Sequence, residues 1–66
     1  MTKEEYLEAV GNKRKFILHL NDGGLIEIDL NIFTCKIHEW YIEFNKSLQY
    51  SFTPYYHSIF CVQVVE

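Results

Sequence analysis

The sequence predicts a mainly β protein (α+β), with a short N-terminal helix followed by five antiparallel strands that form a bent sheet or a small barrel. Three observations lead to this fold class. A helix-capping signal stands near the N-terminus, period-two alternation of apolar and polar residues fills most of the remaining chain, and turn signals separate the alternating runs. With 66 residues, the chain is expected to form one small domain, residues 1–66, without room for a second core.

The helix is predicted over residues 3–10. Thr2 and Glu5 form a T-x-x-E capping box, in which the hydroxyl accepts a backbone N–H of the first turn and the carboxylate accepts one in return. An apolar stripe at helical spacing follows, made of Tyr6, Leu7 and Val10. Gly11 supplies the left-handed residue that commonly ends a helix, so the helix is expected to stop there.

Five strands are predicted from the alternation, over about residues 14–21, 25–34, 37–45, 48–53 and 59–65. The tight turn at residues 21–24 joins the first two strands. Pro54 ends the fourth, because proline cannot donate a ladder hydrogen bond. In the third strand the alternation places Trp40 in the core and leaves Tyr41 available for contact. Such a small meander usually closes into a barrel or half-barrel, since an open sheet leaves aggregation-prone edges.

The charge balance argues against nucleic acid as the main ligand. The formal net charge is −3 and the pI is near 5.5, whereas nucleic-acid binding is driven by neutralising phosphates. We therefore expect no DNA partner. The one basic run is Lys13, Arg14 and Lys15, which we interpret as a solvated loop before the first strand or, in the alternative, as part of an RNA contact.

The sequence also bears on location. No apolar stretch approaches membrane-spanning length, and residues 1–5 lack the features of a signal peptide. We therefore expect no membrane partner and a cytoplasmic protein, whose two cysteines are free thiols. The basic residues are five Lys to one Arg, a bias that fits an AT-rich genome such as that of a phage.

The aromatic content indicates a contact surface. A core of this size cannot hide eleven aromatic rings, so several are expected on the surface, where clustered aromatics mark interaction sites. The candidate contact residues are Tyr41, Tyr55, Tyr56 and His57. For His57 two interpretations remain open: a stacking or hydrogen-bonding residue at a subunit junction or on a base, or a turn histidine that bonds a nearby carbonyl.

The last strand is the candidate edge for self-association. A chain this short buries only about 60% of the surface that its unfolded form exposes, and small domains often compensate by self-association. If the barrel does not close, the alternating residues Phe60, Val62 and Val64 offer an apolar edge for pairing with a second copy or with a partner protein.

Metal and catalytic chemistry are not expected. The spacing of Cys35, His38, His57 and Cys61 is similar to that of a tetrahedral zinc site, but strand positions i and i+3 face opposite sides, so the first pair converges only in a bend. The preferred interpretation is a buried Cys61 and a half-buried Cys35. No nucleophile stands beside a base in a pattern that suggests a catalytic set, so no enzyme activity and no cofactor are predicted.

The order of elements resembles the Sm fold. Residues 20–23 (Leu-Asn-Asp-Gly) stand where Sm-like proteins carry an apolar residue and then Asn/Asp-Gly, and residues 55–62 are similar to the Y-K-H-A-I-x-x-I segment of the bacterial Sm-like RNA chaperones, the Hfq family. The family's Lys in that segment is Tyr56 here, and the Gly expected in the second strand is absent. The resemblance implies a small barrel that assembles into an RNA-binding ring, although other SH3-like barrels fit the strand count.

Two functions from different classes follow. The first is a non-catalytic module that associates with itself and covers a protein partner, as a regulator or inhibitor encoded by a phage or mobile element would. The second is an Sm-like homo-oligomeric ring that binds RNA through Lys13, Arg14, Lys15 and His57. The acidic charge and the missing Lys favour the first, and a basic stripe that also includes Lys46 would favour the second.

Overall fold

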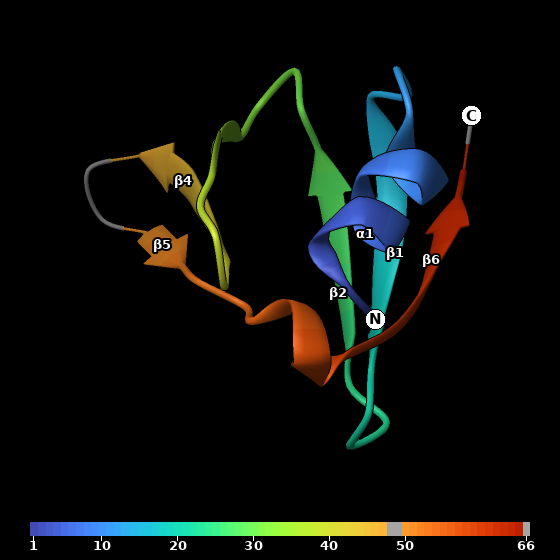
Figure 1. Ribbon diagram of the computed structural model, residues 1–66. Helices are drawn as coiled ribbons and strands as arrows, with labels where there is room; N and C mark the ends of the chain where they lie inside the picture. Colours follow the sequence, from blue (N-terminus) through green and yellow to red (C-terminus); the bar gives the residue numbers. More distant parts are fainter. Residues whose placement is uncertain (48–49, 66) are drawn as a thin grey trace.

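Two three-stranded antiparallel sheets and one helix make up the fold (Figure 1). The computed structural model describes residues 1–47 and 50–65. Its elements, in chain order, are α1 (Lys3–Val10), β1 (Lys15–Leu20), β2 (Leu25–Asp29), β3 (Thr34–Ile37), β4 (Ile42–Ser47), β5 (Tyr50–Phe52), the 3-10 turn η1 (Tyr56–Ser58) and β6 (Ile59–Val64). The strand orders are β2-β1-β6 in sheet A and β3-β4-β5 in sheet B.

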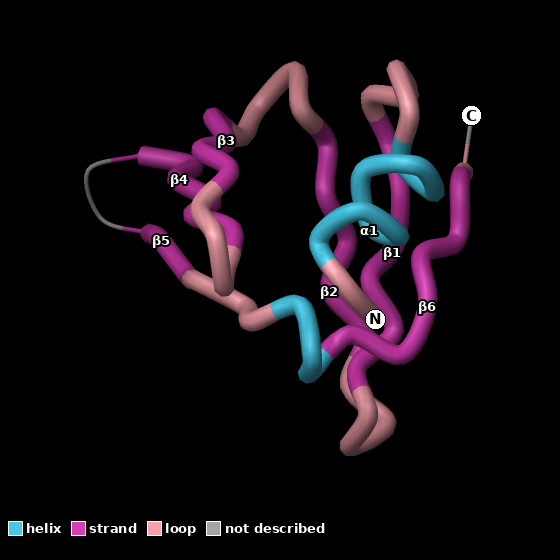
Figure 2. Tube along the Cα trace, in the orientation of Figure 1, coloured by secondary structure: helices cyan, strands magenta, loops and turns pink. Residues whose placement is uncertain are grey.

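The predicted class of a small α+β protein with an N-terminal helix and antiparallel strands is confirmed, but the predicted count of five strands is wrong. Six strands occur among the described residues, and no strand pairing there joins sheet A to sheet B, so the sheets do not form a closed barrel. The tube in Figure 2 shows the two sheets as separate groups of strands joined through loops. Residues 48–49 of the predicted fourth strand lie outside the described part.

Helix α1 has the predicted ends. The Glu5 N–H donates to Thr2 Oγ1 at 3.1 Å, and the Thr2 N–H donates to Glu5 Oε1 at 2.7 Å, which completes the capping box. Gly11 ends the helix with φ of +57°, and its N–H donates to the Leu7 carbonyl. The expected apolar stripe is only partly buried, because Leu7 is 43% exposed. No helix within the described residues is long and apolar enough to cross a membrane.

The predicted hairpin joins β1 to β2. The Leu20 N–H donates to the Gly24 carbonyl at 2.8 Å, and Gly23 has a φ of +92°, a conformation that glycine adopts without steric cost. The Gly24 N–H donates to the Asp22 carboxylate at 2.8 Å. The Asn-Asp-Gly-Gly signal therefore acts as the pattern predicts.

The long strand predicted over residues 25–34 is interrupted. The Asp29 carbonyl accepts the N–H groups of both Ile32 and Phe33 at 2.9 Å, and the Asp29 side chain accepts the Asn31 N–H at 2.9 Å. These bonds form a turn that competes with the extended ladder, as Asp and Asn side chains do at turns. The predicted strand thus becomes β2 and β3, which lie in different sheets.

The strand predicted over residues 37–45 begins late. The His38 N–H donates to the Tyr41 carbonyl at 3.0 Å, which makes residues 38–41 the hairpin turn between β3 and β4. Because alternation applies only within a strand, Trp40 is not directed into the core as predicted and is 73% exposed. The residues that do fill this part of the core are Ile42 and Phe44, both 0% exposed.

The core lies between the two sheets and under the helix. Its buried residues are Tyr6, Val10, Phe16, Leu18, Ile28, Ile42, Phe44, Tyr56 and Ile59. They come from α1, from both sheets and from η1, so every element except β3 and β5 contributes a buried side chain. The core therefore fixes the positions of both sheets relative to the helix.

We expect Leu18→Ala to lower the free energy of unfolding by about 3–5 kcal/mol, because the change removes a fully buried side chain and leaves a cavity. Leu25→Ala makes the same chemical change at a side chain that is 62% exposed, and we expect it to cost under about 0.5 kcal/mol. Urea unfolding followed by circular dichroism measures both. Equal losses in the two variants would contradict the placement of the core.

Candidate interaction surface

A row of four aromatic rings runs along the outside of the β3–β4 turn and the segment before β6. Its members are His38, Tyr41, Tyr55 and His57. His38 stacks on Tyr41 with centroids 4.5 Å apart, Tyr41 meets Tyr55 edge to face at 5.7 Å, and Tyr55 stacks on His57 at 5.5 Å. Such a row offers flat apolar faces and polar tips together, which suits both protein contacts and base stacking.

The backbone holds this row in place. Tyr41 and Tyr55 form a β-bridge, and next to it the Tyr56 N–H donates to the Trp40 carbonyl at 3.2 Å. At the far end of the row, the Asn21 side-chain amide donates to the His57 carbonyl at 2.7 Å. Three of the predicted contact residues are thereby brought together: Tyr41, which is half-buried, and Tyr55 and His57, which are exposed.

Tyr56, the fourth predicted contact residue, lies in the core instead. Its side chain is 3% exposed, its ring packs against Tyr6 at 5.9 Å, and its hydroxyl donates to the His38 carbonyl at 2.7 Å. Burial raises the pKa of the Tyr56 hydroxyl, and nearby negative charge adds to the rise. Tyr56 therefore positions the turn that carries the row rather than offering a face to a partner.

Glu43 anchors the histidine end of the row. His38 Nε2 lies 3.1 Å from Glu43 Oε1, and the Asn45 side-chain amide donates to Glu43 Oε2 at 3.0 Å. The hydrogen bonds from Asn45 and His38 hold the pKa of Glu43 below its ordinary value of 4.5. The sequence pattern gave no direct signal for this cluster, because the His38–Glu43 contact depends on the turn between β3 and β4.

The candidate edge strand β6 carries a bulge at Phe60. His19 pairs with Cys61 and Leu20 pairs with Ile59, so Phe60 is the extra residue opposite β1. Bulges re-aim a side chain, and Phe60 is 71% exposed. A large apolar ring in this position fits a contact surface better than a core strand.

The backbone of β6 also has an open side. The Val65 N–H donates to the Lys15 carbonyl at 3.2 Å, and in an antiparallel pair residues alternate between facing the partner strand and facing away. The N–H and C=O groups of Val62 and Val64 therefore point away from β1. Because β6 ends the order β2-β1-β6, these groups face no other strand within the described residues.

The basic run and His57 lie at opposite ends of β1. The run is Lys13, Arg14 and Lys15. Lys15 begins β1, whereas Asn21, which bonds the His57 carbonyl, follows its last residue. A strand of this length spans about 17 Å. Arg14 also donates to the Leu30 carbonyl at 2.8 Å, so its guanidinium takes part in the fold. The residues predicted to bind RNA, the basic run and His57, therefore do not form one site within a single chain.

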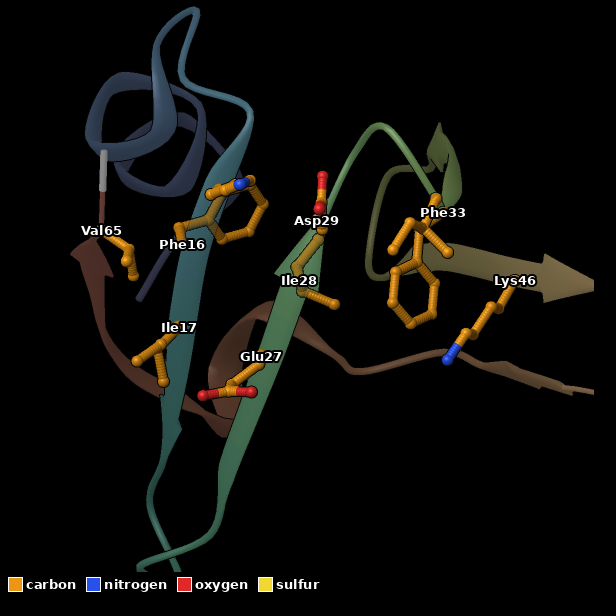
Figure 3. A pocket seen from close by; sticks show the side chains of 10 residues that line it. Phe16, Ile17, Glu27, Ile28, Asp29, Phe33, Lys46 and Val65 are labelled. Atoms are coloured by element: carbon orange, nitrogen blue, oxygen red, sulfur yellow. The ribbon is translucent and has the colours of Figure 1, made fainter.

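Lys15 and Lys46 line a cavity of about 370 Å³ between sheet A and the β4 strand (Figure 3). Its apolar lining includes Ile28 and Phe33, and the Lys46 ammonium lies 6.0 Å from the Phe33 ring centroid. Two carboxylates, Glu27 and Asp29, line the same cavity. The two lysines are therefore balanced by two acids, and no continuous basic stripe forms there.

The four residues weighed as zinc ligands occupy separate elements. Cys35 lies on β3, His38 in the following turn, His57 in η1 and Cys61 on β6. Within residues 1–47 and 50–65, no group of three or more His, Cys, Asp or Glu is arranged to hold a metal ion. Both cysteines are free thiols, but their expected burial is wrong: Cys35 is exposed and Cys61 is half-buried.

The chain matches no protein-family model, and neither the curated proteins nor the solved structures contain a significant match to it. The class of the protein therefore rests on its own fold and surfaces. Within the described residues, these features are two open antiparallel sheets with a short helix, an aromatic row, and edge strands that each pair on one side.

We expect Glu43→Gln to reduce the loss in free energy of unfolding that occurs as the pH falls below neutrality. Because the pKa of Glu43 is lower in the folded than in the unfolded chain, its stabilising contribution is complete above pH 4.5 and is lost as the pH falls through the folded value. Urea midpoints measured between about pH 7 and pH 3 test this. Glu27→Gln is the control, and equal acid sensitivity in both variants would count against the role of Glu43.

Proposed function

We propose that this chain is a non-catalytic binding module that associates with itself through its open strand edges and acts by protein–protein interaction. The observation that carries the proposal is that the sheets stay open: within the described residues each has two edge strands, β2 and β6 in sheet A and β3 and β5 in sheet B. The proposed contact uses the edges of β6 and β5. In Figure 1 these two strands lie on opposite sides of the molecule. One edge of each copy is thus free to meet the other edge of the next copy.

The β5 edge has outward-pointing backbone N–H and C=O groups, which such pairing needs. The Ile42 N–H donates to the Pro54 carbonyl at 3.1 Å, which sets the alternation along the β4–β5 pair. By that alternation the N–H and C=O groups of Ser51 and Thr53 point away from β4. They match the outward groups of Val62 and Val64 on β6, so an antiparallel pair between two copies satisfies both sets.

The contact between β5 of one copy and β6 of the next is head-to-tail. A head-to-tail contact closes into a ring when its rotation allows, and otherwise extends as a filament. The element order, with a bent pair of sheets and a 3-10 turn before the last strand, supports the resemblance to Sm-like proteins and favours the ring. The exposed Phe60 adds apolar area beside the paired strands.

A protein partner is favoured over nucleic acid by charge and by the exposed side chains. The net charge is −3, and the basic run lies away from the aromatic row. Large exposed apolar residues include Trp40, Tyr55 and Phe60, which are residue types enriched at protein interfaces. A cytoplasmic module of this kind acts by covering a surface of its partner.

We expect Val62→Pro to abolish self-association while the chain stays folded. The N–H that proline removes points away from β1, so the substitution breaks pairing between copies and leaves the β1–β6 hydrogen bonds intact. Light scattering after gel filtration measures the mass, and circular dichroism checks the fold.

The matched control is Glu27→Pro, which removes an outward N–H from the other edge of sheet A. A folded Val62→Pro variant with the mass of the wild type would contradict the β6 interface. Phe60→Asp, which places a charge on the edge without changing the backbone, gives a second test if Val62→Pro does not fold.

The second candidate function, an RNA-binding ring, is favoured by the aromatic row. Tyr55 and His57 present stackable faces beside the β5 edge, so several copies in a ring would repeat them. Light scattering with and without a short A/U-rich RNA separates the candidates. We expect an assembly whose mass is indifferent to RNA, and a ring that shifts with RNA would establish the second function instead.

A further inference from the structure

The β3 strand forms an exposed edge of sheet B that the proposed contact between copies does not use. All four of its residues, Thr34–Ile37, are exposed. Because β3 ends the order β3-β4-β5, it pairs only with β4 within the described residues, and Figure 2 shows β3 and β5 at the two edges of this sheet. An exposed edge strand is a template on which an extended segment of another chain can pair.

The backbone of β3 has hydrogen-bonding groups that point away from β4. The His38 N–H donates to the Tyr41 carbonyl at 3.0 Å, which sets the alternation along the β3–β4 pair. By that alternation the N–H and C=O groups of Cys35 and Ile37 face outward. A strand added in antiparallel orientation would therefore exchange two hydrogen bonds with each of these residues.

One face of this edge is apolar. Cys35 lies opposite Phe44 in the register and Ile37 lies opposite Ile42, and both partners on β4 are fully buried. Directly opposite residues share one face of a sheet, so Cys35 and Ile37 lie on the core face. Ile37 is nevertheless 41% exposed. Apolar side chains on an added strand would cover these two residues and extend the core.

The other face of this edge is basic. It carries a surface pocket of about 560 Å³, which contains two ammonium groups and no carboxylate; its lining residues are Thr34, Lys36, Asn45, Lys46, Ser47 and Ser51. Two other pockets, one at Lys15 and one at Lys3, each combine lysine with carboxylates. The pocket beside β3 therefore favours an anionic side chain, whereas the other two are balanced in charge.

Glu43 is the carboxylate that lies beside this pocket. It is opposite Lys36 in the register and so shares its face of the sheet. Its two oxygens already have partners, since His38 Nε2 lies 3.1 Å from one and the Asn45 side-chain amide donates to the other at 3.0 Å. Neither ion pair within the described residues includes Lys36 or Lys46. Both ammonium groups thus remain available to an incoming carboxylate.

We propose that an extended segment of a protein partner, with alternating acidic and apolar residues, adds to the β3 edge as an antiparallel strand. Its apolar residues lie opposite Cys35 and Ile37, and the acidic residue between them lies opposite Lys36 and pairs with the ammonium group. The inference rests on the proposed function, because it names the kind of protein that the module contacts. It uses an edge that the proposed self-association leaves exposed.

A second copy of this chain matches the β3 edge less well than such a partner. The match requires an acidic residue between two residues whose backbone groups face outward. In the other edge strands of this chain the residue at that position is Gln63 in β6, Phe52 in β5 and Ile28 in β2. None of them is acidic, so the charge of Lys36 has no counterpart there.

Fluorescence anisotropy of a labelled peptide, Glu-Val-Glu-Val-Glu-Val-Glu, tests the proposal. We expect saturable binding, and we expect the peptide with Gln in place of Glu to bind about two- to fivefold more weakly. N-methylation of the Val residues removes the N–H groups that face β3 and is expected to weaken binding about tenfold or more. N-methylation of the Glu residues is the matched control, because their N–H groups point away from β3, and it is expected to change little.

Two lysine variants test the charge. Lys36→Gln is expected to weaken binding of the Glu peptide about two- to fivefold and to leave binding of the Gln peptide unchanged. Lys3→Gln makes the same change in net charge at a residue of α1 that lines a different pocket, so it is expected to leave both affinities unchanged. Equal weakening in the two variants would overturn the proposal in favour of diffuse electrostatic attraction.

Three further outcomes would contradict the β3 site. Equal effects of the two N-methylated peptides would exclude strand addition. Equal binding of the Glu and Gln peptides would show that a neutral strand, such as β6 of a second copy, fits the edge as well as an acidic partner. Loss of binding in the folded Val62→Pro variant would place the peptide on β6. We expect that variant to bind the peptide normally, so failure of this proposal and failure of self-association are distinguishable.

Discussion

The turn between β2 and β3 is the constraint on which the rest of the structure depends. Asp29 accepts two backbone N–H groups at its carbonyl and a third at its carboxylate, so the chain leaves the plane of sheet A with its polar groups satisfied. Sheet B is thereby turned over sheet A, and Ile42 and Phe44 close the core against Leu18. A continuous strand through residues 25–34 would keep β3 in the plane of sheet A and would leave those side chains without a cover.

This arrangement leaves strand edges open for a physical reason. Among the described residues, nine buried hydrophobic side chains from α1, η1 and both sheets form the core, while large apolar residues such as Trp40 and Phe60 stay exposed. Closing the barrel would require β5 and β6 to pair within one chain, whereas their N–H and C=O groups now face outward on opposite sides. The proposed pairing between copies would satisfy the same groups and would add apolar burial, for example at Phe60, without a larger core. The self-association that we propose would thus compensate for a small core.

Short sequence motifs predicted the features of the fold that depend on neighbouring residues. The capping box of α1, its glycine end and the turn at residues 21–24 all form as the pattern indicates, because each depends on residues within four positions. Alternation located the cores of β1, β4 and β6, but it could not place the turn at residues 38–41, whose residues carry no Gly or Pro. That turn exposes Trp40 and sets His38 against Glu43, and so the parts of the site that depend on it could not be predicted. The Asp-x-Asn pattern at residues 29–31 was the one available signal for the break before β3.

Tyr56 holds in place both the aromatic row and the backbone of Trp40. Its ring packs on Tyr6 in the core, its N–H holds the Trp40 carbonyl, and its hydroxyl holds the His38 carbonyl. One buried residue therefore holds the β3–β4 turn at two points, with its hydroxyl at His38 and with its backbone N–H at Trp40. Loss of the hydroxyl alone would free the His38 end and leave the core ring in place, whereas the backbone N–H bond to the Trp40 carbonyl would remain. The aromatic row and the exposed Trp40 thus depend on the same buried residue, the first through its side chain and the second through its backbone.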